Sequence, residues 1–439
     1  MSRHQDPAAL GPYPILPEGL VRTIIDPEAH AVVTPVDEAF TWIRANAPLA
    51  QASIEGFDPF WVVSRHHDIQ WISTQPALFS SGQRSLVVMS QAEGAMIRER
   101  TGTPHRLYTM LHMDGPDHLR QRAITQKWFM PAGLGPLAER VRDLARMQAR
   151  RLSDFGGKVD FAAEIAGRFP FHVIMEMMGV PLEEEETFRR ITAILLAPKD
   201  ETANPSLAGV GDDQKTAAVD ASFSGILDEY ARYFTELSAA RAHSPANDIT
   251  TVIAAACADG NLTPAEAIAY FTLLIGAGYA TTAYAIAAGM QQLCADSYLL
   301  HALRTSPELI DAFVDESLRW SSPARHFMRT ATQDVDISGV QVKQGDWLML
   351  CYPSGNRDEL VFQKPFEFRL DRGANPHLAF GAGAHKCLGL HLARLEMRTL
   401  WQELIPRLGQ VFQAGPVSRS RSAMVSGLQS LPIVYQLID

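Results

Sequence analysis

The stretch His377-Leu-Ala-Phe-Gly-Ala-Gly-Ala-His-Lys-Cys387-Leu-Gly389 places a single cysteine in a glycine-rich loop. A helical pattern of apolar residues follows at once, from Leu388 to Leu400. At the start of a helix, unpaired backbone N–H groups and the helix dipole stabilise a thiolate. With no second cysteine in the stretch, these residues suit one axial bond to iron better than a disulfide or a tetrahedral zinc site. The alternative is a buried free cysteine in an ordinary turn.

The segment from Phe380 to Gly389 resembles the haem-binding loop of the cytochrome P-450 family at every diagnostic position. The resemblance implies that haem b is the cofactor and that the Cys387 thiolate is the ligand of its iron. It also implies cofactor contacts at Phe380, Gly381 and Gly389. The implied fold is mainly α with a minor β component, and the haem is held between a long central helix and the helix that follows the cysteine loop.

The composition is typical of a soluble protein with a large core, because 46% of the 439 residues are hydrophobic and 20% are charged. A formal net charge of −10 argues against non-specific binding to nucleic acid. The four cysteines lack metal-like spacing, which fits a reducing compartment. No secretory signal is visible, so we expect a cytoplasmic protein with no membrane and no nucleic-acid partner.

The segment from Ala267 to Ala295 carries no charge and is long enough to span a bilayer. It contains several glycines, threonines and tyrosines and has no basic flank to orient it. A buried core helix is the favoured interpretation. Its start is well defined, because Thr263 suits an N-cap, Pro264 the first helical position and Glu266 the third.

We expect one domain over residues 1–439, with an extended, proline-rich arm at 1–35 and no fused reductase. Helical periodicity dominates the remainder. The predicted helices cover residues 36–46, 117–128, 134–155, 161–178, 183–197 and 216–243. Strand-like segments lie at 61–64, 335–337, 340–342 and 347–351, and residues 79–112 are expected to form a long surface loop.

Glycines and threonines in the middle of the uncharged segment are poor helix formers and are expected to loosen the helix. The loosening either makes room for dioxygen and water beside iron or lets a second helix pack closely. The stretch resembles the central helix of the P-450 family, where a small residue, a glycine, any residue, an acid and two hydroxyl residues follow one another. The resemblance implies a haem contact at Ala277 and catalytic positions at Gly278, Ala280, Thr281 and Thr282.

Ala280 stands where the family carries an acid that helps to move protons. Thr281 retains the hydroxyl that, by the resemblance, orders a water near the bound oxygen. Proton delivery without the acid would use a water chain, another acid or a substrate hydroxyl.

Glu316 and Arg319 are three residues apart, so a helix places the carboxylate and the guanidinium on one face. By itself this spacing is typical of a solvated surface pair. The pair, together with Arg372, resembles the Glu-x-x-Arg signature and the downstream arginine of the P-450 family. The resemblance implies a rigid structural network on the cysteine side of the haem.

His118 and Arg122 are one helical turn apart and present two donor side chains on one face. An exposed basic helix face has the same pattern. The P-450 family has a histidine and an arginine here that bind the haem propionates. The resemblance adds further cofactor contacts at Arg329, His377 and His385.

The substrate pocket implied by the resemblance is mostly apolar, which indicates a hydrophobic substrate held by shape. Tyr279 and His326 are expected to offer hydrogen bonds. The other expected lining residues are Leu86, Val88, Leu274, Ile275, Ala324, Phe327 and Leu428.

The resemblance implies a haem-thiolate monooxygenase that inserts one atom of O2 into a C–H bond of a hydrophobic small molecule of the terpenoid, steroid or aromatic class. Electrons are expected from a ferredoxin-type donor with an NAD(P)H-dependent reductase. Two alternatives stay open. Ala280 allows a peroxide-driven or non-oxygenating haem-thiolate enzyme, and the same loop suits a non-enzymatic haem-thiolate ligand binder.

Overall fold

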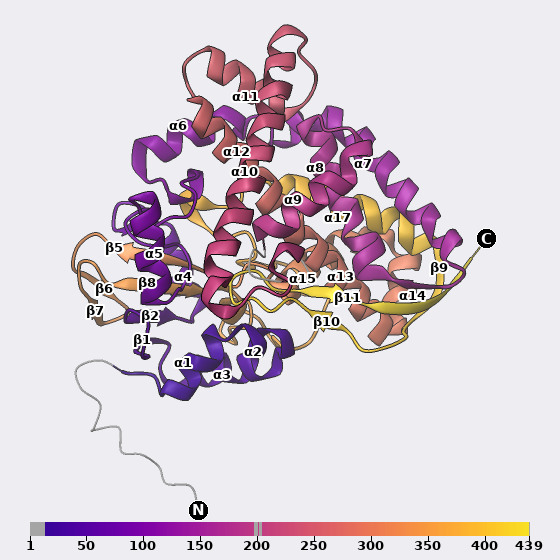
Figure 1. Ribbon diagram of the computed structural model, residues 1–439. Helices are drawn as coiled ribbons and strands as arrows, with labels where there is room; N and C mark the ends of the chain where they lie inside the picture. Colours follow the sequence, from indigo (N-terminus) through magenta and orange to yellow (C-terminus); the bar gives the residue numbers. More distant parts are fainter. Residues whose placement is uncertain (1–13, 197–200, 202–203, 439) are drawn as a thin grey trace, which may run out of the picture.

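The computed structural model describes residues 14–196, 201 and 204–438, and helices form most of it (Figure 1). Figure 1 shows the strands β1, β2, β5 and β8 at the left and the helices α7, α8 and α17 at the right. The α-helices of the described residues are α1 (Glu18–Ile25), α2 (Pro27–Val32), α3 (Thr34–Asn46), α4 (His66–Ser73), α5 (Gln91–Thr101), α6 (Gly115–Gln126), α7 (Pro131–Arg151), α8 (Arg168–Met178), α9 (Glu185–Leu196), α10 (Asp212–His243), α11 (Ile249–Ala258), α12 (Pro264–Gly278), α13 (Ala280–Ala295), α14 (Ser297–Thr305), α15 (Ile310–Ser321), α16 (Tyr352–Gly355) and α17 (Leu390–Leu404).

The β component consists of small sheets, of which the largest has the strand order β1-β2-β8-β5-β3. In it β2 and β8 are parallel, and the other neighbours are antiparallel. A second sheet has the order β4-β12-β9, and β6-β7 and β10-β11 are separate antiparallel pairs. The strands are β1 (Leu49–Ala52), β2 (Phe60–Val63), β3 (Phe79–Ser80), β4 (Lys158–Asp160), β5 (His326–Ala331), β6 (Val335–Ile337), β7 (Val340–Val342), β8 (Trp347–Cys351), β9 (Leu408–Gln413), β10 (Ser418–Arg419), β11 (Leu428–Ser430) and β12 (Pro432–Leu437).

The predicted fold class, mainly α with a minor β component, is therefore confirmed. The strands predicted at 335–337, 340–342 and 347–351 form with those bounds as β6, β7 and β8. Glycine-containing turns separate these strands, and turns of that kind are the clearest local signal in a sequence.

The extended arm expected at residues 1–35 is wrong for the described part of that range, which contains α1, α2 and the start of α3. Pro27 occupies the first turn of α2, where the Asp26 side chain accepts a hydrogen bond from the backbone N–H of Glu28. Proline begins a helix well, because an N–H in the first turn has no partner within the helix. Residues 1–13 lie outside the described residues.

The long loop expected at residues 79–112 is also wrong over part of its length, because it contains β3 and α5. Ser90 caps α5 by accepting from the backbone N–H of Glu93, and Gly102 ends the helix with φ of 69°. Ile97 is buried, but most of this helix is not. A helix with so little buried surface has no apolar stripe for the sequence to reveal.

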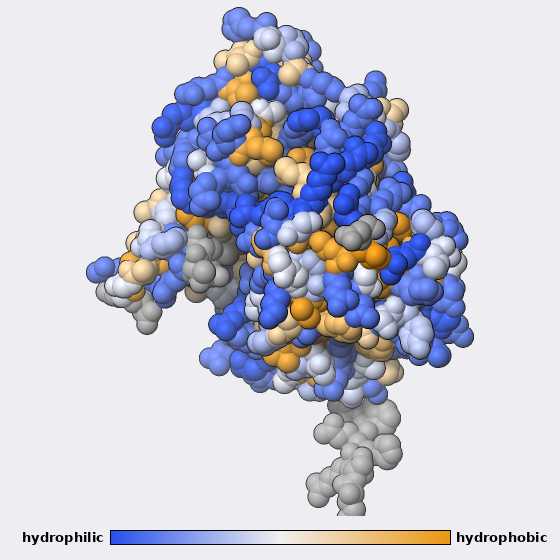
Figure 2. Space-filling model, turned by 90° about the vertical axis from the view of Figure 1, so that its right-hand side faces the viewer, coloured by the Kyte–Doolittle hydropathy of each residue, from blue (hydrophilic) through white to orange (hydrophobic). Residues whose placement is uncertain are grey.

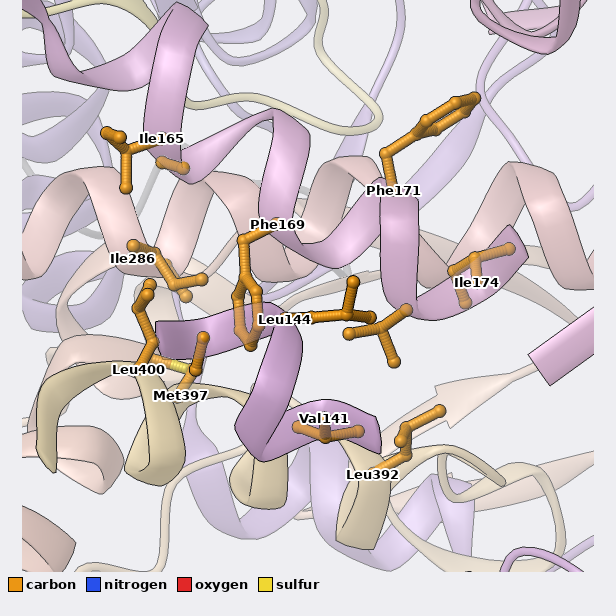
Figure 3. Close-up of a cluster of buried hydrophobic side chains, with 14 of the residues drawn as sticks. Val141, Leu144, Ile165, Phe169, Phe171, Ile174, Ile286, Leu392, Met397 and Leu400 are labelled. Carbon is orange, nitrogen blue, oxygen red and sulfur yellow. The ribbon is translucent and has the colours of Figure 1, made fainter. Parts of the chain in front are cut away.

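The main core lies where α7, α8, α13 and α17 meet (Figure 3). Phe169 is fully buried and projects from α8 into the space lined by Ile286 of α13 and Met397 of α17. Phe171 projects from another face of α8, and its ring centroid lies 5.3 Å from that of Tyr279. Helix α8 therefore packs against both the core and the interruption of the central helix.

The predicted central helix forms in two parts, α12 and α13, which meet at Tyr279. It begins with a capping box, because the Thr263 and Glu266 side chains each accept from the other residue's backbone N–H. The interruption lies next to Gly278, within the poor helix formers, and the predicted loosening is confirmed.

By length and composition, Pro264–Ala295 is long and apolar enough to cross a membrane, but 61% of its most apolar window is buried inside the protein. The core helix of a water-soluble protein has the same composition. The face of the molecule in Figure 2 is largely hydrophilic, with hydrophobic residues in scattered patches. The preference for a core helix in the sequence analysis agrees with this burial.

Candidate active site

The cysteine loop is a tight turn that brings Cys387 to the start of α17. The backbone N–H of Cys387 donates to the carbonyl oxygen of Phe380 over 2.8 Å and closes the turn. Gly381 and Gly383 have φ values of 65° and 67°, a conformation that other residues rarely adopt. A side chain at Gly383 would also collide with the carbonyl oxygen of Ser73 at the end of α4. The glycine pattern of this loop therefore has a structural cause.

The Cys387 thiol is subject to opposing electrostatic influences. Burial raises the pKa of the thiol, whereas the backbone N–H of Gly389 and the guanidinium groups of Arg122 and Arg394 act to lower it. Arg122 also donates from Nη2 to the carbonyl oxygen of Lys386 over 2.7 Å, so it holds the loop in place. Burial outweighs these groups, so the pKa of the free thiol lies above its ordinary value. The donors and cations would favour the thiolate, the form that binds a metal, once a metal is bound.

Glu316 on α15 is the centre of a buried ion network. Arg319 donates to both carboxylate oxygens, from Nε over 2.8 Å and from Nη2 over 2.7 Å. Arg372 adds contacts of 2.9 and 3.0 Å from its Nε. Burial alone would raise the pKa of Glu316, but the hydrogen bonds and charge of Arg319 and Arg372 outweigh it, and the pKa lies below its ordinary value. The structure thus brings together the three residues that the sequence assigned to a network.

The network reaches the cysteine loop through Asn356. Arg319 donates from Nη1 to the carbonyl oxygens of Asn356 and Pro365 over 2.8 and 2.9 Å. The side-chain oxygen of Asn356 accepts from the backbone N–H of Leu378 over 2.6 Å. Because Leu378 begins the loop that ends at Cys387, these bonds tie α15 to the position of the thiol.

His118, Arg329 and His385 form a second cluster beside the cysteine loop, and the ring centroids of the two histidines are 4.2 Å apart. Burial lowers the pKa of His385 to about 2, and the charges of Arg329 and His118 add to this effect. Burial and the charge of Arg122 also lower the pKa of His118. The Nε2 atom of His118 is buried and has no hydrogen-bond partner among the described residues. Donor groups therefore converge here without an acceptor for all of them.

Asp114 is the acid that faces this cluster. Its carboxylate already accepts hydrogen bonds from the Ser80 hydroxyl and from the backbone N–H groups of Ser81 and Gly82. Asp114 therefore organises the loop after β3 and does not satisfy the histidines. The Ser81 hydroxyl in turn lies 3.2 Å from Nε2 of His385.

His377 lies apart from the cluster, and the cofactor contact expected there stays a prediction, since its buried Nε2 has no hydrogen-bond partner among the described residues. Its Nε2 lies 3.6 Å from Oδ1 of Asp315, which also accepts from Nε of Arg394 over 2.8 Å. The centroid of its ring is 5.6 Å from that of Phe380. His377 thus lies close to Asp315 of α15 and to Phe380, without a hydrogen bond from its Nε2.

The central helix, formed by α12 and α13, has Ala277 and Thr281 on its accessible side. Ala277 is exposed and Thr281 is half-buried, whereas Ala280 and Thr282 are 7% and 4% exposed. The Thr281 hydroxyl donates to the carbonyl oxygen of Ala277 over 3.0 Å, and that of Thr282 to the carbonyl oxygen of Gly278 over 3.3 Å. These bonds supply donors to carbonyl groups at the interruption of the helix. Of the two hydroxyls, that of Thr281 is the accessible one.

Gly278 faces α8, and the catalytic position expected there stays a prediction. A Cβ at Gly278 would lie 2.5 Å from Cδ1 of Ile174. The absence of a side chain lets α12 and α8 approach closely, which was the alternative interpretation of the small residues in this segment.

The expected pocket residues fall into two groups. Tyr279, Val88, Ala324 and Phe327 are half-buried. The other five are buried. They are Leu86, Leu274, Ile275, His326 and Leu428, of which Ile275 and Leu428 are only 1% and 2% exposed within the main core, and the lining expected of them stays a prediction.

His326 ties two segments together and does not offer a free hydrogen bond to a substrate, so that expectation is wrong. Its Nδ1 lies 2.9 Å from the carbonyl oxygen of Ala423, and its Nε2 accepts from the backbone N–H of Val88 over 3.2 Å. Burial lowers the pKa of His326 to about 4, so the ring is neutral and both nitrogens are used.

Three further residues contribute to the site without having been predicted from the sequence: Arg394, Asp114 and Asn356. Arg394 stacks over the Phe380 ring at 4.8 Å and lies two helical turns after Cys387, a spacing that was visible in the sequence. Asp114 is one turn before His118. Asn356 carried no local signal, because its partners are 22 and 37 residues away.

The family model described as cytochrome P-450 matches residues 90–408. Cytochrome P-450-terp from Pseudomonas sp. is 36% identical over 423 residues, which cover 96% of this chain and 98% of the relative. The chain belongs to the cytochrome P-450 family. This cytochrome P-450 is also 29% identical over 433 residues to a steroid C26-monooxygenase from Rhodococcus jostii strain RHA1, covering 96% of the chain and 86% of the relative.

Solved structures give the same assignment. The crystal structure of CYP108D1 from Novosphingobium aromaticivorans matches with a TM-score of 0.88 and 34% sequence identity, covering 97% of this chain and 100% of that one. The chain is thus a cytochrome P-450 monooxygenase, an oxidoreductase, and the alternative of a non-enzymatic ligand binder is not supported.

The cofactor of this family is haem b with an axial cysteine thiolate, and the residues around Cys387 fit it. His118 has a buried, unpartnered Nε2, and Arg329 and Arg122 lie near it. A pair of propionate carboxylates supplies the acceptors and negative charge that this cluster lacks. Cys387 would hold the iron, and His118, Arg329 and His385 would hold the propionates.

The cysteine assignment makes a spectroscopic prediction. In Cys387→Ser the side chain is no longer a thiolate, so the strongly red-shifted band of the ferrous–carbon monoxide complex is expected to disappear. Cys294→Ser on α13 is the matched control and is expected to keep the band. A Cys387→Ser protein that keeps the band would overturn the assignment.

Glu396 on α17 makes a prediction about pH. It is 1% exposed, its Oε2 has no hydrogen-bond partner among the described residues, and burial raises its pKa well above the ordinary value. The folded protein therefore retains a proton that the unfolded chain loses near pH 4.3, and stability falls by about 1.4 kcal/mol per pH unit above that point until the folded pKa is reached.

Glu396→Gln removes this titration, so the stability of the variant relative to the wild type is expected to rise with pH over that window. Chemical denaturation of both proteins between pH 4 and 8 measures the difference. The exposed Glu308→Gln is the control. Parallel curves for wild type and Glu396→Gln would show that the carboxyl group does not behave as described.

Proposed function

We propose that this cytochrome P-450 is a cytoplasmic, single-domain enzyme that hydroxylates a hydrophobic small molecule of the terpenoid, steroid or aromatic class. Its electrons come from a ferredoxin-type donor with an NAD(P)H-dependent reductase. The observation that carries the proposal is the 36% identity to cytochrome P-450-terp across 96% of the chain. A second relative is named a steroid C26-monooxygenase, which supports a hydrophobic small molecule as the substrate.

The half-buried side chains expected to line the substrate pocket support a hydrophobic substrate. Val88, Ala324 and Phe327 are half-buried apolar residues, the first in the segment after β3, the second just before β5 and the third within β5. The ring of Phe327 is held by an edge contact with Tyr352 at 6.2 Å between centroids. Tyr279 adds a phenol whose pKa is raised by burial, so it stays protonated and can donate to a substrate oxygen. Mostly apolar walls with few polar groups select by shape.

Haem bound through Cys387 supplies the difficult chemistry, the insertion of one atom of O2 into a C–H bond. The protein supplies positioning. The network of Glu316 and Arg319 holds the cysteine loop in one geometry, and Thr281 holds a proton on its Oγ1 at the accessible face of the distal helix. Its carbonyl partner, Ala277, fixes the orientation of that hydroxyl.

A peroxide-driven enzyme is the second candidate, and Ala280 is the observation that favours it. Ala280 is buried, and among the described residues no carboxylate is hydrogen-bonded to Thr281. An enzyme that receives oxygen already reduced, as hydrogen peroxide, has less need of a relay for protons.

A ligand screen followed by turnover tests the proposed function. Titration of the haem protein with terpenoids, steroids and aromatics is expected to give the spectral change of displaced iron-bound water with at least one of these classes. The best ligand is then expected to be hydroxylated with NAD(P)H, ferredoxin and reductase faster than with hydrogen peroxide. Product with peroxide alone would favour the second candidate, and no product with either would contradict both.

The acid that is absent at position 280 makes a separate prediction. A positioned general acid typically contributes about 10²–10⁴-fold to a proton-transfer step. We therefore expect Ala280→Asp to raise the amount of product per NAD(P)H oxidised while leaving peroxide-driven turnover unchanged. Ala280→Asn has the same size without the acid and is the matched control. Equal product per NAD(P)H in the wild type and Ala280→Asp would show that Ala280 does not limit proton delivery.

A further inference from the structure

A cavity with a volume of about 390 Å³ lies between the start of α3, the end of α13 and the segments that follow α15. Its walls include Asp37, Gln291 and Trp320 together with the three arginines Arg325, Arg357 and Arg419. None of the residues that line it belongs to the cysteine loop or to the haem and substrate positions discussed above. The cavity is therefore separate from the active site.

The arginines are buried without ionic partners. Arg325 and Arg357 are 8% and 7% exposed, and Arg419 is half-buried. Among the described residues, no carboxylate lies within 4.0 Å of any of the three guanidinium groups. An unpaired charge in such a position is costly, because it has lost its water without gaining a counter-ion.

Uncharged oxygen atoms accept hydrogen bonds from some of the N–H groups of each guanidinium. Arg357 donates to the carbonyl oxygens of Arg319 and Trp320 over 3.3 and 2.9 Å and stacks on the Trp320 ring at 4.6 Å. Arg325 donates to the carbonyl oxygen of Ser321 over 3.4 Å, and Arg419 to Oε1 of Gln291 over 3.1 Å. These contacts hold the groups in place around the cavity.

Donors remain unused in the same place. The Nε atoms of Arg325 and Arg357 are buried and have no hydrogen-bond partner among the described residues. Burial lowers the pKa of both arginines to about 10, and Asp37 is the acid that offsets this. His30, which faces Arg325, has its pKa lowered to about 3 and is neutral. The walls thus carry two more positive than negative charges.

We propose that this cavity binds a small, doubly charged oxyanion, either a phosphate or a dicarboxylate. Guanidinium groups bind the paired oxygens of these anions through two parallel hydrogen bonds. A double negative charge balances the excess on the walls. The volume exceeds that of the anionic group alone, so an organic portion fits against the apolar wall that Trp320 and the end of α13 provide.

Arg325 connects the anion to the rest of the fold. Its backbone N–H donates to the carbonyl oxygen of Met424 over 2.7 Å, and its carbonyl oxygen accepts from the N–H of Tyr352 over 3.1 Å. It also lies between Ala324 and β5 in the chain. A bound anion therefore stabilises the junction of α15, β5 and the segment near residue 424, and it raises the stability of the folded protein by mass action.

Thermal unfolding of the haem-loaded protein tests this site. The protein is purified without phosphate or carboxylate buffers and titrated at pH 8 with phosphate or succinate against chloride at equal ionic strength. Phosphate, succinate or both are expected to raise the Tm with a saturable dose dependence that chloride does not reproduce. A response to phosphate alone assigns a phosphate group, and a response to succinate alone assigns a dicarboxylate.

Arg419→Gln is the main variant, because Arg419 is the least buried of the three arginines. It is expected to weaken the apparent affinity by about tenfold or more, the effect of removing one partner of a desolvated charge pair. Arg421→Gln is the matched control, since its side chain is 74% exposed and its partner is Glu28. Normal carbon monoxide spectra verify that both variants are folded.

Arg325→Gln gives an independent readout. Without anion, it removes an uncompensated buried charge, so its Tm is expected to equal or exceed that of the wild type, and its response to the anion is expected to be lost. The proposal is overturned if neither phosphate nor succinate acts beyond chloride, or if Arg419→Gln responds as the wild type does. Because these measurements do not use turnover, they are independent of the proposed substrate.

Discussion

The buried carboxylate of Glu316 is the interaction on which the rest of the site depends. Two arginines and the backbone N–H of Arg369 converge on it, and Arg319 then reaches the carbonyl groups of a segment distant in sequence. A buried ion network adds little net stability compared with apolar packing, but removal of one partner leaves an uncompensated charge. Its contribution here is geometric, because it permits one arrangement of α15 and the cysteine loop.

The proximal and distal sides of the site are built on different physical principles. On the proximal side, charged groups and positive-φ glycines fix the loop around Cys387. On the distal side, small residues determine how closely helices approach, as Gly278 does against Ile174. The accessible hydroxyl of Thr281 lies close to the break between α12 and α13. Residue 280, its neighbour in the chain, is a buried alanine and has no acidic side chain. Charged groups and tight turns thus dominate the first side, and close packing of helices dominates the second.

Local sequence patterns correctly predicted the elements that are bounded by clear capping or turn residues. They failed for elements whose conformation depends on tertiary contacts. The capping box at Thr263 and the turns between β6, β7 and β8 depend only on residues that are neighbours in the sequence. Both are present in the structure as predicted. The prolines near the N-terminus suggested an extended arm, but Pro27 lies in the first turn of a helix, a position that prolines also favour. Both conformations are compatible with the same residue, and packing against the sheet decided between them.

The sequence by itself determined that Cys387 is the metal ligand candidate, that Glu316 and Arg319 share a helix face, and that a loosened central helix crosses the site. Each of these rests on residues close together in the chain, where spacing and backbone preference act directly. The tertiary structure decided which side chains meet from distant segments. His385 lies beside His118 and Arg329, and His377 lies near Asp315. Both ring nitrogens of His326 form hydrogen bonds, one with the backbone of Val88 and one with that of Ala423. A histidine has the same chemistry in all three places, so only its packed surroundings settle what it binds.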